Sequence, residues 1–174
     1  MNSLDPKGKQ RKNDKYHSYK GTVGKVTNAL LNRDFYAEKP FEKTTTDITQ
    51  LNVCNNKVYP SPVLDLLNSE VVSYSISTSP NLYQIREKLN GLFEELSADA
   101  KPIFHANQGW QYQHAEYQRL LKEHNIAQSM FRKGNCMDNG TMENFFGRLN
   151  VKMFYGEKFE SVNTFIDELK RYID

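Results

Sequence analysis

Ile-Phe-His-Ala-Asn-Gln-Gly, residues 103–109, is the stretch that decides the fold. Its apolar beginning predicts a short buried strand over residues 102–105, near the middle of a sheet. The residues from Asn107 to Gly109 then have the composition of a turn. In open α/β sheets, sites gather where strands end, so Asn107 is a candidate site residue, although a plain turn explains the same residues.

Three strand candidates precede this stretch. Residues 45–53 and 71–77 alternate between the two faces of a strand, and residues 58–67 are mostly apolar. Pro60 interrupts the second candidate, which predicts a sheet edge or a bulge there. Asparagine-rich turns lie between the candidates, so we expect an antiparallel meander.

Elsewhere the apolar residues have helical spacing. Residues 81–96 are expected to form a helix that Ser79 caps and Pro80 begins, and residues 126–130 are expected to form another strand. Three more helices are predicted, at residues 113–124, at residues 139–154, and from Ser161 onward. Up to the helix at residues 139–154 the order is β-β-β-α-β-α-β-α, which is that of a ribonuclease-H-like domain. We therefore expect an α/β fold with a five-stranded mixed sheet flanked by helices.

The 174 residues fit one domain, and a net charge of +2 says little about partners. Residues 1–26 are basic, with seven Lys or Arg against two Asp, and are expected to be a flexible arm. A short helix or turn is expected over residues 27–39. The predicted division is therefore a basic N-terminal arm with a short helix, residues 1–39, and a core over residues 40–174.

Cysteine usage and hydropathy predict the compartment. Cys54 and Cys136 form neither a zinc pattern nor a disulfide framework, so two reduced thiols are expected. No stretch approaches the ~20 apolar residues of a membrane span, and the N-terminus has no apolar signal region. The expectation is a cytoplasmic protein with no membrane partner.

Asp47 and Glu143 join Asn107 as candidate site residues. Asp47 stands among Thr, Ile, Leu and Val, where a charge must be solvated, paired or bound to a metal. Glu143 lies beside the apolar stripe of its predicted helix and can face the strand ends. An exposed first-turn glutamate, favoured by the helix dipole, explains it equally well. Phosphoryl transfer with one or two Mg²⁺ ions uses such hard oxygen ligands.

Basic and aromatic side chains near these three residues suggest nucleic-acid binding. Arg132 and Lys133 precede a predicted loop, while Arg148 and Lys152 share one face of the Glu143 helix. All four are candidate phosphate contacts, with a solvated basic face as the alternative. Two aromatic residues that follow Asn107, Trp110 and Tyr112, either stack on a base or pack in the core; we favour the core. Asp138 is a candidate cap for the Glu143 helix.

Five blocks of the chain resemble the integrase-like catalytic core of bacterial insertion-sequence transposases, a DDE group related to retroviral integrases. The blocks are Thr-Thr-Asp-Ile-Thr (45–49), Ser-Pro-Val-Leu-Asp-Leu (61–66), His-x-x-Gln-Gly-Trp-Gln-Tyr (105–112), Ser-Met-x-Arg-Lys-Gly-Asn-Cys-x-Asp-Asn (129–139) and Met-Glu-Asn-Phe-Phe-Gly (142–147). The resemblance covers residues 17–174. The 35 residues between Asn107 and Glu143 match the family's spacing of its last two acids.

The resemblance implies a polynucleotidyl transferase that depends on Mg²⁺ or Mn²⁺. Such enzymes cut DNA at the end of an element and use the freed 3′-hydroxyl to attack another strand. Asp47, Asn107 and Glu143 would be the catalytic residues and the first, second and third metal ligands. The implied partners are the element ends and target DNA, bound by a homo-oligomer, and the implied location is the bacterial cytoplasm in association with the nucleoid.

The chain departs from the family pattern at several positions. Asn107 stands where the family has Asp, Ala106 where it has Ser, and Pro60 where it usually has Leu. The family has Trp near Thr44, and its C-terminal segment extends beyond Asp174, so we expect a C-terminally truncated core. We also expect the Asn107 amide to weaken a two-metal site, because it lacks the charge of a carboxylate. A non-catalytic DNA-binding or oligomerising remnant and a plain nuclease of the same fold stay open as alternatives.

Overall fold

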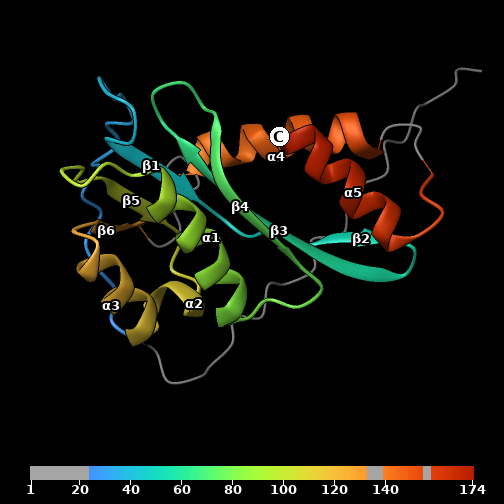
Figure 1. Ribbon diagram of the computed structural model, residues 1–174, viewed down its shortest axis with the longest axis horizontal. Helices are drawn as coiled ribbons and strands as arrows, with labels where there is room; N and C mark the ends of the chain where they lie inside the picture. Colours follow the sequence, from blue (N-terminus) through green and yellow to red (C-terminus); the bar gives the residue numbers. More distant parts are fainter. Residues whose placement is uncertain (1–23, 133–138, 155–157) are drawn as a thin grey trace, which may run out of the picture.

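The computed structural model describes residues 24–132, 139–154 and 158–174, and a mixed sheet runs through its middle (Figure 1). The strands are β1 (Lys43–Thr46), β2 (Leu51–Val53), β3 (Asn56–Asp65), β4 (Val71–Ser77), β5 (Ile103–Ala106) and β6 (Ala127–Met130). The helices are α1 (Leu82–Glu95), α2 (Trp110–Gln113), α3 (Ala115–Glu123), α4 (Gly140–Phe154) and α5 (Val162–Ile173). None of the helices in the described residues is both long enough and apolar enough to span a membrane.

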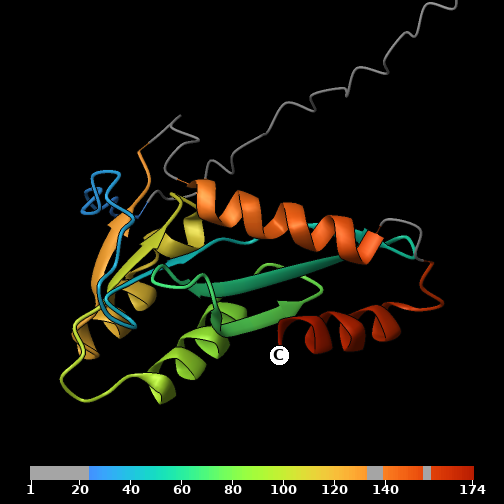
Figure 2. The same cartoon turned by 90° about the horizontal axis from the view of Figure 1, so that it is seen from above.

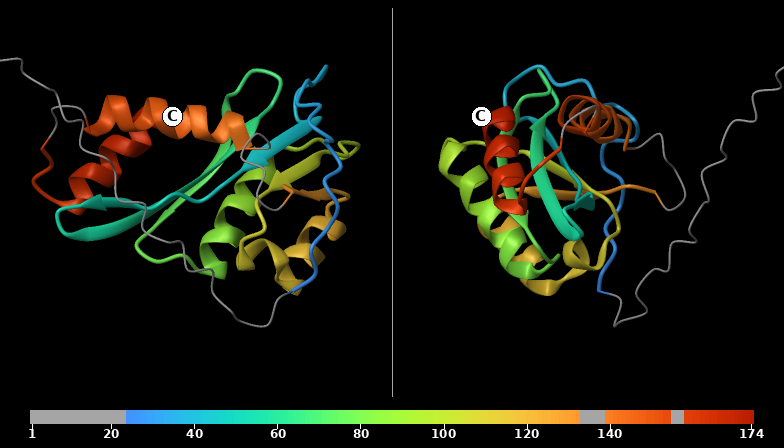
Figure 3. Two further views of the ribbon diagram at one scale, coloured as in Figure 1. Left: turned by 180° about the vertical axis from the view of Figure 1, so that it is seen from behind. Right: turned by 90° about the vertical axis from the view of Figure 1, so that its right-hand side faces the viewer.

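The sheet is mixed, as predicted. β1 pairs in parallel with β5, and β5 with β6, whereas β3 is antiparallel to β1, β2 and β4. α1 and α4 lie on opposite sides of this sheet (Figures 2 and 3). The expected ribonuclease-H-like arrangement of an α/β sheet between helices is therefore confirmed, with six strands in place of five.

The sixth strand arises because the predicted strand over residues 45–53 is interrupted. Residues 47–50 leave the ladder between β1 and β2, yet they stay beside β3. The backbone N–H of Thr49 donates to the carbonyl of Pro60 at 3.2 Å, and the hydroxyl of Ser61 donates to the carbonyl of Asp47 at 3.2 Å. The interruption frees Asp47 from regular pairing at the end of β1.

Pro60 lies inside β3, so the prediction of an edge or bulge at this residue was wrong. β3 has partners on both sides, Pro60 is in register with Ile76 of β4, and the register shift falls at Val63 and Leu64 instead. The Pro60 carbonyl accepts a hydrogen bond from Thr49, so the ring nitrogen faces the interrupted segment as well. Because this segment is outside the ladder, the N–H that proline lacks removes no hydrogen bond between paired strands.

The local structure differs from the sequence expectations at two points. Asn81, rather than Ser79, caps α1, because its side chain accepts the Gln84 backbone N–H at 2.9 Å. The four-residue helix α2 was not predicted. A short helix or turn was expected over residues 27–39, and a turn is present there at residues 30–33.

Two apolar clusters hold the helices on the sheet. The first joins α1, α2 and α3 to the sheet, and the second joins α4 and α5 to β2 and β3. Their fully buried members include Ile85, Leu89, Leu92, Phe104 and Leu121 in the first, and Val58, Leu64, Met142, Leu149 and Phe165 in the second. The second cluster fixes α4, and with it Glu143, beside the sheet.

Candidate active site

Asp47 and Asn107 are brought together by the register of two parallel strands. Thr46 at the end of β1 is opposite Ala106 at the end of β5, so the next residue of each strand occupies the same edge of the sheet. The side-chain amide nitrogen of Asn107 donates to Asp47 Oδ1 at 2.5 Å. Two of the three predicted site residues are therefore in direct contact.

Three N–H groups surround the Asp47 carboxylate. Besides Asn107, the side-chain amide of Asn139 donates to Oδ2 at 2.9 Å, and the backbone N–H of Ile48 donates to Oδ1 at 2.8 Å. Burial raises the pKa of Asp47, and the negative charge of Glu143 raises it further. The hydrogen bonds from Asn139 and Ile48 and the positive charge of Lys88 oppose this rise.

The Asn107 side chain is used at both ends. While its nitrogen donates to Asp47, its carbonyl oxygen accepts the backbone N–H of Gly109 at 2.7 Å. The alternative interpretation of this stretch, a plain turn, therefore describes the same residue correctly. The Gly109 N–H also selects the amide orientation, because the opposite orientation would place two donors against each other.

Glu143 lies in the first turn of α4, and its side chain is exposed. Its negative charge acts on the Asp47 carboxyl, which places the two acids in one electrostatic neighbourhood. Exposure also agrees with the simpler interpretation of Glu143 as a first-turn residue favoured by the helix dipole. The structure therefore joins Asp47 to Asn107 by a direct hydrogen bond, whereas Glu143 acts on Asp47 through its charge.

A divalent ion would find oxygen ligands here, although Asn107 has to turn to supply one. Asp47 and Glu143 are carboxylates of the kind that Mg²⁺ prefers, but no group of three Asp, Glu, His or Cys forms an ion site among the described residues. The atom of Asn107 that faces Asp47 is a nitrogen. Ion binding through the Asn107 oxygen would replace its hydrogen bonds to Asp47 and Gly109. The donor set fits one ion at that cost.

Two family models match the chain. Residues 37–136, more than half of the chain, and residues 143–174 match two family descriptions that both read integrase core domain. The chain belongs to the integrase core domain family. The match includes Asp47 and Asn107 in its first segment and Glu143 at the start of its second.

The relatives of this integrase core include bacterial transposases. It is 46% identical over 173 residues to an uncharacterized transposase-like protein of Haemophilus influenzae, covering 99% of this chain and 79% of that protein. It is 35% identical over 144 residues to transposase InsF for insertion sequence IS3A of Escherichia coli, covering 83% of this chain and 50% of that transposase. The chain thus spans only half the length of InsF, and it is a core domain of the transposase and integrase type.

Solved structures confirm the fold. The integrase core resembles a chain of the simian T-cell lymphotropic virus intasome in complex with PP2A regulatory subunit B56 gamma, with a TM-score of 0.60, 19% identity, and coverage of 89% of this chain and 52% of that chain. It also resembles the HTLV-2 integrase catalytic core domain in complex with magnesium, with a TM-score of 0.54, 17% identity, and coverage of 75% of this chain and 84% of that chain. Both likenesses show the ribonuclease-H-like fold.

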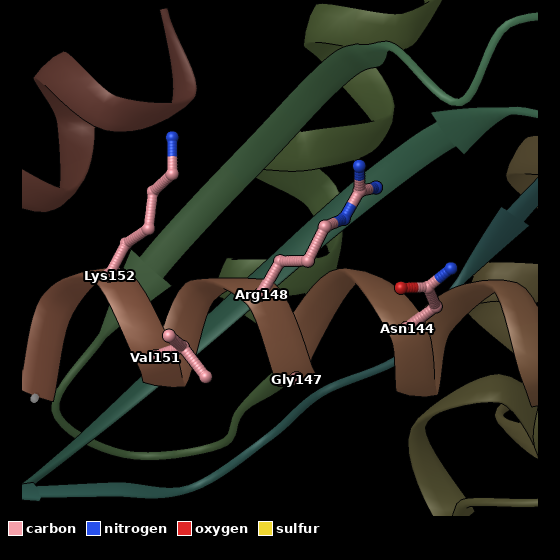
Figure 4. Close-up of a pocket in the computed structure, with 5 residues that line it drawn as sticks. All are labelled: Asn144, Gly147, Arg148, Val151 and Lys152. Atoms are coloured by element: carbon pink, nitrogen blue, oxygen red, sulfur yellow. The ribbon is translucent and has the colours of Figure 1, made fainter.

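The predicted DNA-binding residues are spread over two parts of this integrase core. Arg132 follows β6 and is exposed, while Lys133, like the predicted cap Asp138, lies outside the described residues. Arg148 and Lys152 are exposed on α4, and their side chains extend from the same side of the helix (Figure 4). The lysine ammonium also sits 5.6 Å from the centre of the Tyr172 ring, a cation–π contact with α5.

The two aromatic residues after Asn107 have different environments. Tyr112 is fully buried, and its ring and that of Tyr117 pack edge to face with their centres 5.4 Å apart. The core interpretation is therefore confirmed for Tyr112. Trp110 at the start of α2 is 42% exposed, so the core interpretation is wrong for this residue.

Two residues of the site escaped the sequence prediction. Asn139 directly precedes α4 and holds Asp47, but as a lone amide it resembles an ordinary loop residue. Lys88 is completely buried in α1, where burial lowers its pKa to about 7 and the charge of Asp47 opposes the change. Its spacing in the sequence could have indicated that it is buried. Lys88 is three residues after Ile85 and four before Leu92, which places it on the buried face of α1.

Proposed function

We propose that this integrase core cuts and joins DNA strands as the catalytic part of an insertion-sequence transposase, with Mg²⁺ or Mn²⁺ as its cofactor. The observation that carries the proposal is the meeting of Asp47 and Asn107 at the ends of parallel strands, with Glu143 nearby on α4. Polar groups at such strand ends are where open α/β sheets place their sites. The names of the bacterial relatives and the magnesium in the HTLV-2 integrase complex support the same function.

Asp47, Asn107 and Glu143 are the proposed catalytic residues and metal ligands. A bound ion would supply positive charge to the attacking and leaving oxygens of the phosphodiester. The chain's own contribution is to hold Asp47 with three N–H donors, while the negative charge of Glu143 acts on the same carboxyl. Because Asn107 brings an amide in place of a carboxylate, we propose that a two-metal site is weakened in this chain.

DNA is the proposed substrate and partner. Arg132, Lys133, Arg148 and Lys152 would contact phosphates, which hold a nucleic acid without reading its sequence. The exposed indole of Trp110, close along the chain to Asn107, would stack on a frayed base. We further propose that the protein acts as a homo-oligomer on paired DNA ends, associated with the nucleoid of a bacterial cytoplasm. The HTLV-2 core has been described in dimeric and trimeric forms.

Strand transfer tests the proposal. A pre-cut end of the element that encodes the chain is incubated with target plasmid and Mg²⁺ or Mn²⁺, using the native chain and its Asn107→Asp variant. The variant is expected to give metal-dependent joined products, and the native chain far fewer. Adding Asp47→Asn to the variant should abolish them. Absence of any metal-dependent product from Asn107→Asp would overturn the proposed function.

The hydrogen bond between Asn107 and Asp47 favours a second candidate, a DNA-binding or oligomerising remnant without catalysis. In that case the Asn107 amide occupies the position of the ion beside Asp47, and no ion binds there. The native chain decides between the two, because clear Mg²⁺-dependent cleavage by it rules out the remnant. A plain nuclease of the same fold would give cut products without joined ones.

A further inference from the structure

Lys88 is an ionisable residue that the core encloses completely. It lies on the buried face of α1 between Ile85 and Leu89 and has no solvent exposure. Moving an ammonium out of water costs several kcal/mol unless hydrogen bonds replace the lost hydration. The molecule therefore contains specific partners for this group, and their identity shows what the lysine does.

The three donors of the Lys88 ammonium meet three hydroxyls from three elements. Nζ donates to Thr46 Oγ1 of β1 at 2.7 Å, to Ser61 Oγ of β3 at 2.7 Å and to Tyr112 Oη of α2 at 3.0 Å. The ammonium also lies 4.9 Å from the centre of the Tyr112 ring. A protonated lysine has three N–H groups to donate, so this set satisfies it fully.

The hydroxyls continue from Lys88 to the backbone at the end of β1. Ser61 Oγ donates to the carbonyl of Asp47 at 3.2 Å, and Thr46 Oγ1 donates to the carbonyl of Pro62 at 2.7 Å. Each of these hydroxyls thus accepts from the ammonium and donates to a carbonyl, so donors and acceptors match. One chain of hydrogen bonds leads from α1 through Ser61 to Asp47.

We propose that Lys88 is a positioning residue of the active site, which fixes the backbone of Thr46 and Asp47 from the α1 side of the sheet. The role rests on the proposed function, because a fixed Asp47 matters most when it holds an ion. The segment it fixes is where β1 leaves the ladder, so regular strand pairing does not hold Asp47. A buried ammonium with three directed donors supplies that constraint; an apolar side chain of equal volume fills the space without it.

Two other roles for Lys88 predict different outcomes. A lysine that only contributes to stability would leave the local order of residues 47–49 and the ion affinity unchanged in a folded variant. A lysine whose charge mainly repels a bound cation would lower the ion affinity, and its removal would raise it. If Lys88 is a positioning residue, its removal changes the ion affinity in the opposite direction. The affinity falls because Asp47 is held less firmly, even though a positive charge has been removed.

The first test measures amide hydrogen exchange in the metal-free full chain. The variants are Lys88→Met, Ser61→Ala and their combination, with Lys122→Met at an exposed position of α3 as the control. Lys88→Met should speed exchange of the Ile48 and Thr49 amides by about 10-fold relative to amides of α5. Ser61→Ala should give the same local effect with a smaller loss of stability. The combination should add little, because both act through one hydrogen-bond chain.

Uniform changes across the chain, or additive effects of the two substitutions, would overturn the proposal. If Lys88→Met does not fold, Ser61→Ala alone decides, and unchanged exchange at Ile48 and Thr49 in that variant overturns the proposal. The Lys122→Met control should leave both amides unaffected.

The second test measures Mn²⁺ affinity by electron paramagnetic resonance in the Asn107→Asp background. Adding Lys88→Met should weaken Mn²⁺ binding by about 10-fold, the low end of the effect of substituting groups that support a ligand. An unchanged or higher affinity contradicts a positioning role. If Mn²⁺ binds to neither protein, the proposed function fails, and the exchange measurements still decide the role of Lys88 because they involve no metal.

Discussion

Asn107→Asp is expected to make the metal-free protein less stable and to make its stability depend on a divalent ion. The substitution replaces the amide nitrogen 2.5 Å from Asp47 Oδ1 with a carboxylate oxygen. It removes a hydrogen bond to a charged group, which contributes about 1.5–3 kcal/mol. It also adds repulsion of about 4 kcal/mol before screening, for charges about 4 Å apart at an effective dielectric constant of about 20.

Protonation of one of the two acids relieves part of this repulsion, because neighbouring carboxylates share a proton readily. The expected net loss in EDTA at neutral pH is therefore about 2–4 kcal/mol, within the range for breaking a buried polar contact. For a domain of this size, that loss lowers the melting temperature by about 5–15 °C. Mn²⁺ at about 100 times its dissociation constant should return about 2.7 kcal/mol.

Thermal unfolding followed by circular dichroism, with EDTA and with Mn²⁺, measures both effects. Asn52→Asp is the matched control, because it makes the same chemical change at an exposed position of β2. The control should unfold like the native chain in both buffers, and the native chain should gain little from Mn²⁺. A variant as stable as the native chain in EDTA, or one that Mn²⁺ does not stabilise, would refute the account of how Asn107 acts.

Three further predictions concern pH, DNA and the α1 cap. Because the folded pKa of Asp47 is raised, the stability from this group is present below about pH 4 and is lost as pH rises through the raised value. Urea unfolding over a pH series should therefore show the native chain losing stability relative to Asp47→Asn as pH rises; parallel profiles would contradict this. Arg148→Ala should lower the salt dependence of DNA binding by about one phosphate contact, and Lys152→Ala by less because its ammonium is shared with an aromatic ring; fluorescence anisotropy at several salt concentrations measures both. Asn81→Ala should lower the free energy of unfolding by about 1 kcal/mol, whereas Ser79→Ala should change it by less than about 0.5 kcal/mol, as chemical denaturation can show; equal losses would refute the assignment of the cap.

Much of the fold followed from local patterns, because those patterns report which face of an element is buried. The alternation of residues 71–77 and the helical spacing that begins near Leu82 appear almost unchanged as β4 and α1. The position of Asn107 at a strand end was likewise readable, since a short apolar run followed by turn residues has few other interpretations. Its contact with Asp47 needs only that the two strands be parallel and in register.

The features that the sequence did not reveal all depend on distant partners. In the break between β1 and β2, the backbone forms hydrogen bonds with Pro60 and Ser61 of β3. The sequence of residues 47–50 itself contains no signal for this break. Asn139 becomes a partner of Asp47 only once α4 lies against the sheet. Lys88 breaks the apolar pattern of α1, but its three hydroxyl partners come from separate parts of the chain. Such networks are visible only when the elements are placed together.

The central claim is that Asp47, Asn107 and Glu143 form one weakened site for a divalent ion. Anomalous scattering from Mn²⁺-soaked crystals of the native chain and of Asn107→Asp tests it most directly. The account predicts a strong anomalous peak between the Asp47 and Glu143 carboxylates in Asn107→Asp, and a weak one or none at the same place in the native chain. A peak away from these residues, or no peak in Asn107→Asp at saturating Mn²⁺, would contradict it.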